Sequence, residues 1–123
     1  MRLVVTFLLM LAAAPAWADW VKVDESAERA YYIDSASIRK TAQTAKVWTI
    51  QDLKIANIAG GRSRRALQEF DCAEPKDRIL SISAYSWSMA RGTVLFEENR
   101  ERPWRPTTPG TVNDRIRGYV CGR

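Results

Sequence analysis

One spacing in the sequence is typical of serine acyl-transfer enzymes, Ser37-x-x-Lys40. On a helix this spacing places the lysine one turn from the serine, where its amine can activate the hydroxyl group. The accompanying S-D-N and K-T-G motifs are absent from the sequence, and the chain is too short for the fold that carries them. The alternative interpretation of Ser37 and Lys40 is a solvated helical turn.

The absence of histidine from the sequence excludes several classes of active site. Ser-His-Asp and Cys-His nucleophilic sites need an imidazole, as do histidine-ligated zinc and haem. A site that uses carboxylates alone, such as Asp71 and Glu74, stays open, and it requires a raised carboxyl pKa in a cleft. We therefore expect a protein that is not an enzyme and that has no cofactor and no metal.

The densest cluster of charge is formed by Arg62, Arg64 and Arg65. Guanidinium groups bind phosphate and carboxylate through paired hydrogen bonds, so these three side chains are candidate contacts for an anionic ligand. Consecutive residues of a strand point to opposite faces. The alternative interpretation is therefore a solvated strand end, with arginine stems lying on apolar surface.

Residues 1–18 have the layout of a cleaved secretory signal peptide. Arg2 precedes an apolar run, and Ala16-Trp17-Ala18 supplies small residues at the two positions that a signal peptidase reads, before Asp19. The run is shorter than the roughly 20 residues of a membrane span, although a retained N-terminal anchor is the alternative. We expect cleavage near Ala18/Asp19, a periplasmic or secreted protein, and no transmembrane segment.

Residues 19–123 have the length of one domain. The formal net charge of the whole chain is +5, a mild excess that fits acidic partners such as glycans, lipopolysaccharide or acidic proteins. Export argues against nucleic acid as a partner. No cysteine near the cleavage site is present to take an N-terminal lipid.

Cys72 and Cys121 are the two cysteines of the chain. An even count in an exported protein indicates one disulfide. The long loop that it closes suggests a stabilisation of about 4 kcal/mol from chain entropy. The alternative is a pair of free thiols or a redox pair, for which the C-x-x-C spacing is missing.

Short runs of β-branched and aromatic residues predict about six strands. Asp34 can cap a helical turn over 35–39, Gly60-Gly61 offers a tight turn, and the proline-rich segment 102–110 is typical of a crossover. Trp104 within this crossover is either a buried anchor or a ligand contact. The expected strands cover residues 20–23, 30–33, 45–53, 63–72, 78–89 and 93–96.

The alternation of side chains assigns the residues of two expected strands, 63–72 and 78–89, to the two faces of the sheet. Period two places Ala66, Phe70 and Cys72 on one face of 63–72. In 78–89, Leu80 and Ile82 share a face, and Ile79 lies on the other with Ser81. Because both faces carry large residues, we expect 78–89 to be a central strand covered on both sides.

A C-terminal helix is predicted from Thr111, a good N-cap followed three residues later by Asp114. Its apolar stripe consists of Val112, Ile116, Tyr119 and Val120. An unbroken helix would turn Cys121 away from that stripe, so Gly118 either ends the helix or the helix continues. A run of strands followed by one helix predicts an α+β fold: an antiparallel sheet of about six strands with the helix packed on one face.

A series of short segments runs through the sequence in a fixed order. They are Trp20-Val21-Lys22-Val23, Tyr31-Tyr32-Ile33-Asp34, Ser37-Ile38-Arg39, Val47-Trp48, Asp52-Leu53-Lys54, Ser63-Arg64-Arg65-Ala66-Leu67, Phe70-Asp71-Cys72, Arg78-Ile79-Leu80-Ser81, Ala84-Tyr85-Ser86, Trp104-Arg105-Pro106, Pro109-Gly110-Thr111 and Tyr119-Val120-Cys121. In this order and in its cysteine placement, the sequence resembles the bacterial surface-adhesin protein E family.

The resemblance implies an antiparallel sheet whose C-terminal helix is tied down by a Cys72–Cys121 disulfide. It also implies a non-enzymatic, adhesion-type binding module of the cell envelope, which binds a protein or glycan at the envelope or the host surface and can form a homodimer. The alternative is a self-associating structural protein of the periplasm with no separate ligand.

Overall fold

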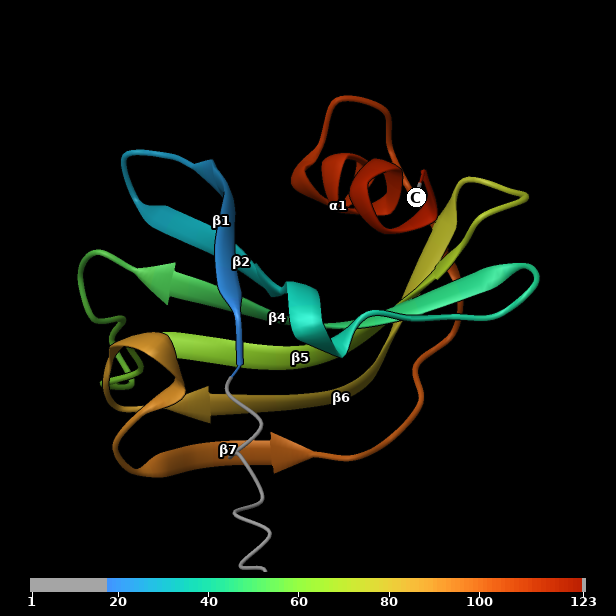
Figure 1. Ribbon diagram of the computed structural model, residues 1–123. Helices are drawn as coiled ribbons and strands as arrows, with labels where there is room; N and C mark the ends of the chain where they lie inside the picture. Colours follow the sequence, from blue (N-terminus) through green and yellow to red (C-terminus); the bar gives the residue numbers. More distant parts are fainter. Residues whose placement is uncertain (1–17, 123) are drawn as a thin grey trace, which may run out of the picture.

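An antiparallel β-sheet with one α-helix above it makes up the described part of the chain, residues 18–122 of a computed structural model (Figure 1). Six strands follow one another across the sheet in the order β1-β2-β4-β5-β6-β7. Their bounds are Trp20–Glu25 (β1), Arg29–Asp34 (β2), Thr44–Leu53 (β4), Ser63–Asp71 (β5), Lys76–Tyr85 (β6) and Val94–Glu98 (β7). Apart from Ala18, the predicted signal peptide lies outside the described residues.

Three further kinds of element complete the fold. The two-residue strands β3 (Arg39–Lys40) and β8 (Arg105–Pro106) pair with β4 and β6. Turns of 3-10 helix cover Ser35–Ser37 and Ser88–Ala90, and the helix α1 spans Val112–Cys121. The predicted α+β fold, with a sheet of about six strands and a C-terminal helix on one face, is confirmed.

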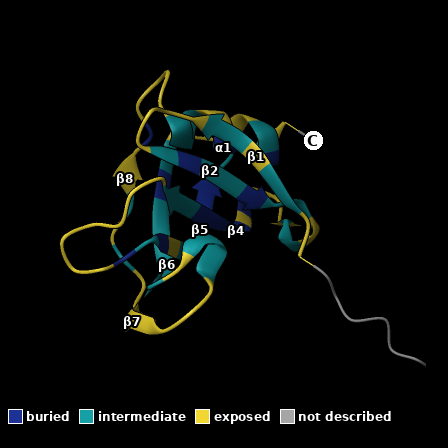
Figure 2. Ribbon diagram, turned by 90° about the vertical axis from the view of Figure 1, so that its left-hand side faces the viewer, coloured by how far each residue is buried: buried dark blue, intermediate teal, exposed yellow. Residues whose placement is uncertain are grey.

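The hydrophobic core lies between α1 and the middle of the sheet. Ala45 and Phe70 are opposite one another on β4 and β5 and have no exposed surface. Ile33 of β2 is equally buried, and Ile116 and Val120 pack onto these residues from α1. The buried residues in Figure 2 accordingly lie in the strands beneath the helix. Thr111 caps α1 as predicted, because its hydroxyl accepts from the Asp114 amide at 3.3 Å.

The helix continues through Gly118, which settles the open question about its end. Arg117 and Cys121 are four residues apart and therefore share a second face beside the apolar stripe. Arg117 Nε donates to the main-chain oxygen of Asp71 at 2.7 Å, and Cys121 forms the disulfide with Cys72. An unbroken helix thus reaches the end of β5 with two attachments.

Strand β6 differs from its prediction in extent and in the faces of its residues. It ends at Tyr85 and not near residue 89. A bulge at the pairing with Leu67 and Gln68 sets Ile79 opposite Gln68 and Ile82 opposite Ala66, so both isoleucines lie on the helix side of the sheet. The expected sharing of a face by Ile79 and Ser81 is wrong. Strand β6 lies between β5 and β7, as expected of a central strand, and its residues are half-buried apart from the buried Asp77.

The backbone conformation of the turn after β6 is not predicted by its sequence. Met89 and Ala90 both adopt left-handed conformations, with φ of 55° and 57°. Their amides are held by side chains of other strands: Met89 N donates to Asp52 Oδ1 at 3.0 Å, and Ala90 N donates to Ser63 Oγ at 2.9 Å. Ser63 Oγ in turn donates to the Trp87 carbonyl oxygen at 2.5 Å. These bonds offset the cost of the strained conformation.

The crossover from β7 to α1 is attached to the start of β6 through a buried carboxylate. Asp77 accepts from Arg105 Nε at 2.8 Å and from Thr107 Oγ1 at 2.6 Å. Trp104 is half-buried, with the guanidinium of Arg78 4.2 Å from its ring centre and Lys76 Nζ 5.3 Å away. The buried anchor of this segment is therefore Thr107 rather than Trp104.

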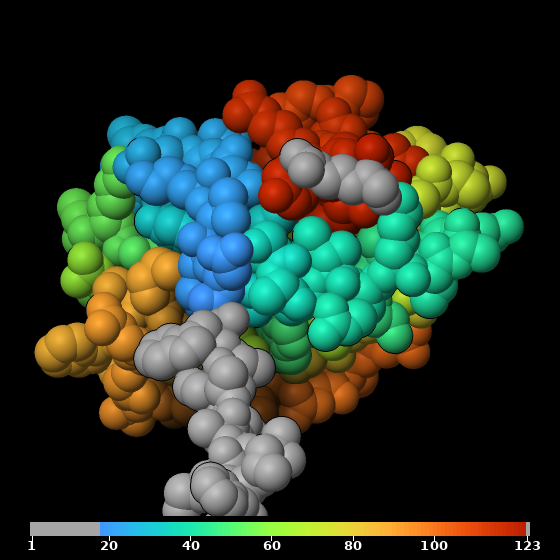
Figure 3. Space-filling view, in the orientation of Figure 1, coloured from blue at the N-terminus to red at the C-terminus, as the bar shows by residue number. Residues whose placement is uncertain are grey.

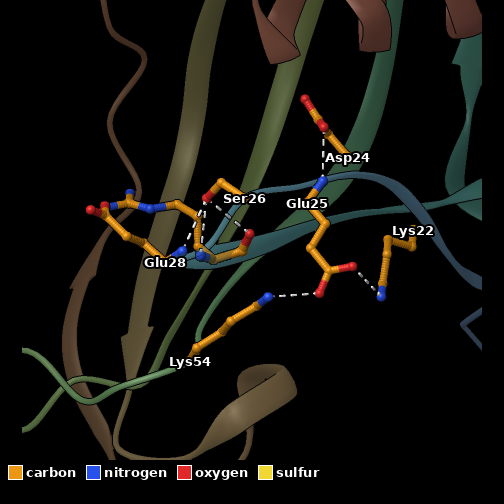
Figure 4. A network of polar contacts seen from close by, with 7 residues as sticks. Lys22, Asp24, Glu25, Ser26, Glu28 and Lys54 are labelled. Carbon is orange, nitrogen blue, oxygen red and sulfur yellow. Dashed lines mark hydrogen bonds and ion pairs between the residues drawn. The ribbon is translucent and has the colours of Figure 1, made fainter.

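The β1–β2 hairpin is linked to the residue that follows β4 by ion pairs (Figure 4). Glu25 accepts from Lys54 Nζ at 2.9 Å and from Lys22 Nζ at 3.1 Å. The hydrogen bonds from Lys54 and then from Lys22 lower the pKa of the Glu25 carboxyl. The positive charge of Lys54 is therefore partly neutralised at the base of the loop between β4 and β5.

Candidate functional site

The serine and lysine of the acyl-transfer spacing have structural roles. Ser37 Oγ donates to the Asp34 carbonyl oxygen at 2.7 Å and accepts from the Trp48 amide at 3.0 Å. Lys40 Nζ donates to the Cys121 carbonyl oxygen at 2.9 Å. Because the hydroxyl proton of Ser37 is held by a main-chain oxygen, this geometry does not support an activated serine.

The carboxylate of Asp71 caps a turn. Its Oδ1 accepts from the amides of Glu74 at 2.9 Å and Ala73 at 2.8 Å. These bonds, led by the one from Glu74, lower the pKa of the Asp71 carboxyl. A carboxylate pair acting as acid and base requires a raised pKa, so Asp71 does not meet that requirement.

Residues 18–122 hold no group of three or more cysteine, aspartate or glutamate side chains placed to bind a metal ion. Within the same range, every helix is too short or too polar to span a bilayer.

The three candidate arginines are separated by the fold. Arg62 Nε donates to the Leu53 carbonyl oxygen at 2.9 Å. Arg65 lies over the ring of Trp48, 4.0 Å from its centre, on the sheet face away from α1. Arg64 is exposed on the helix side, and within residues 18–122 it makes no hydrogen bond or ion pair. The opposite orientation of Arg64 and Arg65 follows the strand alternation.

The helix side of the sheet is open where α1 does not cover it, and two adjoining hollows lie there. Both are lined by Arg64, Ile82 and Arg102. We call this surface the sheet groove. Apolar side chains dominate its first hollow: Leu53, Ala84, Leu95 and Phe96. The second hollow carries Thr49, Gln51, Gln68 and Asn113 among its polar groups.

Among residues 18–122, Arg64 is the cation of the sheet groove that forms no ion pair. Arg102 Nε lies 3.6 Å from Glu98 Oε1, and Arg105 is paired with Asp77. The amide groups of the second hollow are close to one another, with Gln68 Nε2 3.4 Å from Asn113 Oδ1. The groove can therefore bind an anionic group at Arg64, with apolar surface on one side and amide groups on the other.

Sequence reasoning missed Arg102 and the polar residues of the second hollow. A signal was available for two of them, because Gln51 is opposite Arg64 in the strand register and Gln68 is four residues after Arg64 on β5. Both residues therefore share its face. Arg102 and Asn113 carried no such signal, since they reach the groove from the crossover and from α1.

The comparison with protein families matches residues 20–122 to surface-adhesin protein E. The chain belongs to the surface-adhesin protein E family. Membership supports an adhesin-type role at a bacterial surface, and it accounts for the order of the short segments along the sequence. No curated protein matches the chain.

Solved structures of Haemophilus influenzae protein E share the fold. Crystal form II superposes with a TM-score of 0.65 at 19% identity, over 83% of this chain and 96% of that chain. The selenomethionine form gives 0.62 at 17% identity, over 81% and 90%. Protein E from the non-typeable bacterium gives 0.56 at 18% identity, over 85% and 84%. At these identities the likeness extends to the fold alone.

Proposed function

We propose that the protein is an exported, non-enzymatic binding module of the adhesion type, which binds a protein or glycan of the cell envelope or of a host surface. Family membership and the predicted signal peptide support this role. The observation that carries it is the exposed guanidinium of Arg64 in the sheet groove, which has no partner in the part of the chain that the structure describes.

The groove suits an anionic ligand of macromolecular size. A carboxylate, sulfate or phosphate group can take paired hydrogen bonds from Arg64. Beside it, Phe96 offers an apolar side chain that is 50% exposed, and burial of such surface adds affinity in proportion to area. Of the three candidate arginines, we assign this ligand contact to Arg64.

The test compares two neighbouring substitutions that remove the same charge, Arg64→Gln and Arg65→Gln. Probes are an immobilised sulfated polysaccharide, host matrix proteins and an envelope fraction. With the probe that binds the parent protein, Arg64→Gln should weaken binding by roughly tenfold to a hundredfold, since a charge-assisted hydrogen bond contributes about 1.5–3 kcal/mol. Arg65→Gln should leave it nearly unchanged. An equal loss in both variants, or no binding to any probe, contradicts the proposal.

Self-association without a separate ligand is the second candidate, and β7 favours it. This strand lies at one end of the sheet, and Val94, Leu95 and Phe96 are 49%, 46% and 50% exposed. Edge strands offer unpaired main-chain groups to a second copy. Sedimentation equilibrium of the parent protein and of Leu95→Lys tests this: a dimer that the substitution dissociates supports it, and a monomeric parent protein contradicts it.

We propose a periplasmic or secreted location after cleavage before Asp19. The intact mass of protein recovered from the periplasm and from the medium tests both statements. A product that starts at Asp19 in either fraction supports them. An uncleaved chain in the membrane fraction contradicts them.

A further inference from the structure

Large apolar side chains are exposed at one end of the molecule. Ile58 is fully exposed, Ile55 is 84% exposed and Trp87 is 67% exposed. They belong to two connections, the β4–β5 loop (54–62) and the β6–β7 loop (86–93), which lie next to each other at the left of Figure 3. The second loop is hydrogen-bonded to β4 through Met89 and Asp52. Figure 2 is viewed from this end of the molecule.

The same two loops contain cations and no acidic residue. Lys54 is paired with Glu25, but within residues 18–122 neither Arg62 nor Arg91 forms an ion pair. These two arginines line a hollow with the ring of Trp87. Ser86 and Ser88 supply polar groups to the same hollow. A basic, hydroxyl-lined hollow beside an exposed indole is complementary to a phosphate group.

Both loops are held in shape, so the exposure of their tips is fixed by the backbone. Asn57 closes the first loop with two hydrogen bonds to Gly61. Its main-chain N–H donates to the Gly61 carbonyl oxygen at 2.9 Å, and its side-chain Oδ1 accepts from Gly61 N at 2.8 Å. This ring places Ile58 at the tip. In the second loop, Ser63 holds the Trp87 carbonyl oxygen and the Ala90 amide. The apolar side chains are therefore presented with little ordering cost in the backbone on binding.

We infer that this end of the molecule docks on an anionic phospholipid surface, with Ile55, Ile58 and Trp87 entering the headgroup region and Arg62 and Arg91 binding lipid phosphate. Apolar side chains that project between cations match the boundary between headgroups and acyl chains. Tryptophan is favoured at that depth, and basic residues near the surface are attracted by anionic lipids. The surface adjoins the sheet groove, because Asn57, Ala59 and Gly61 of the β4–β5 loop line the first hollow of that groove. It does not include Arg64.

The test is cosedimentation of the exported protein with vesicles of phosphatidylcholine alone or mixed equally with phosphatidylglycerol. Binding should require phosphatidylglycerol and weaken as salt is added. Arg91→Gln should weaken binding about fivefold, and Ile55→Ser with Ile58→Ser should weaken it by roughly tenfold or more. A blue shift of tryptophan fluorescence on binding should be lost in Trp87→Phe.

The matched control is Arg39→Gln, which removes the same exposed group from β3 and should leave vesicle binding unchanged. Thermal unfolding checks that each variant is folded. Equal losses in Arg39→Gln and Arg91→Gln overturn the inference, as does a folded parent protein that binds neither kind of vesicle. If the folded parent protein binds neither kind of vesicle but is captured by immobilised envelope proteins, and Ile55→Ser with Ile58→Ser abolishes that capture, the surface binds a protein partner instead.

Discussion

Thr107 donates a hydrogen bond of 2.6 Å to Oδ2 of Asp77, a carboxylate with no exposed surface. Thr107 is itself only 4% exposed. Thirty residues of sequence separate the two, and they include the whole of β7. The bond therefore fixes the crossover against the start of β6, and it determines where α1 begins its path over the sheet.

Thr107→Val, which keeps the shape of the side chain, should destabilise the protein by about 2 kcal/mol. The substitution leaves a buried carboxylate oxygen without its hydrogen-bond donor. A buried acceptor without a donor lowers the free energy of unfolding by roughly 1–3 kcal/mol. Urea unfolding of the parent and the variant measures the difference. Thr108→Val is the control, because Thr108 is exposed, and an equal loss in both variants contradicts the role given to Asp77.

Removal of the disulfide should cost about 4 kcal/mol of stability. Cys72 and Cys121 are 49 residues apart, and chain entropy gives about 4 kcal/mol for a loop of that length. Urea unfolding of the parent protein, with and without reductant, and of the Cys72→Ala/Cys121→Ala variant measures it. An unchanged stability of the parent protein in reductant, with full reduction shown by thiol alkylation, contradicts this prediction. Arg117 and the core would then hold α1 on the sheet without the disulfide.

Acid should weaken the turn between β5 and β6. The pKa of Asp71 lies below its ordinary value of 3.8 in the folded protein, because the amides of Glu74 and Ala73 donate to its carboxylate. A lowered folded pKa stabilises the protein above pH 3.8, and this contribution is lost as the pH falls through the folded value.

The measurement is the free energy of unfolding between pH 2 and pH 6, compared with that of Asp71→Asn. The parent protein should lose more stability than the variant as the pH falls. Glu74→Gln is the control, since the Glu74 side chain is 71% exposed. Parallel pH profiles for the parent and Asp71→Asn are the result that contradicts this prediction.

The fold was predictable because its determinants are local. Aromatic and β-branched runs defined the strands, and Thr111 with Asp114 defined the start of α1. The bulge opposite Leu67 and Gln68 was not predictable, since it arises from pairing between strands. The left-handed turn at Met89 and Ala90 was missed for the same reason: side chains from β4 and β5 hold it.

Only the part of the candidate site that lies on a single strand, β5, could be predicted from the sequence. The alternation of side chains along β5 was sufficient to place Arg64 and Arg65 on opposite faces of the sheet. Arg102 was not found, because it reaches the groove from a crossover whose position depends on Asp77. Asp77 lies just before the expected strand 78–89, and nothing in a linear pattern distinguishes an exposed aspartate from a buried one.

Gly118→Ala and Gly110→Ala should change stability in opposite directions. A Cβ at either position meets no atom within 4 Å, but Gly110 has φ of +79°, whereas Gly118 is inside α1. Alanine in the helix should stabilise the protein by about 0.5–1 kcal/mol through lower entropy of the unfolded chain. Alanine at the left-handed position should destabilise it by about 1–2 kcal/mol.

Urea unfolding of the two variants distinguishes a continuous helix from one that ends at Gly118. Because steric contact is absent at both positions, the sign of each change reports the backbone alone. A stabilised Gly118→Ala with an intact disulfide supports the unbroken α1 that carries Cys121 to Cys72. A destabilisation of Gly118→Ala as large as that of Gly110→Ala indicates a left-handed residue at 118, and the helix then ends before its attachment to β5.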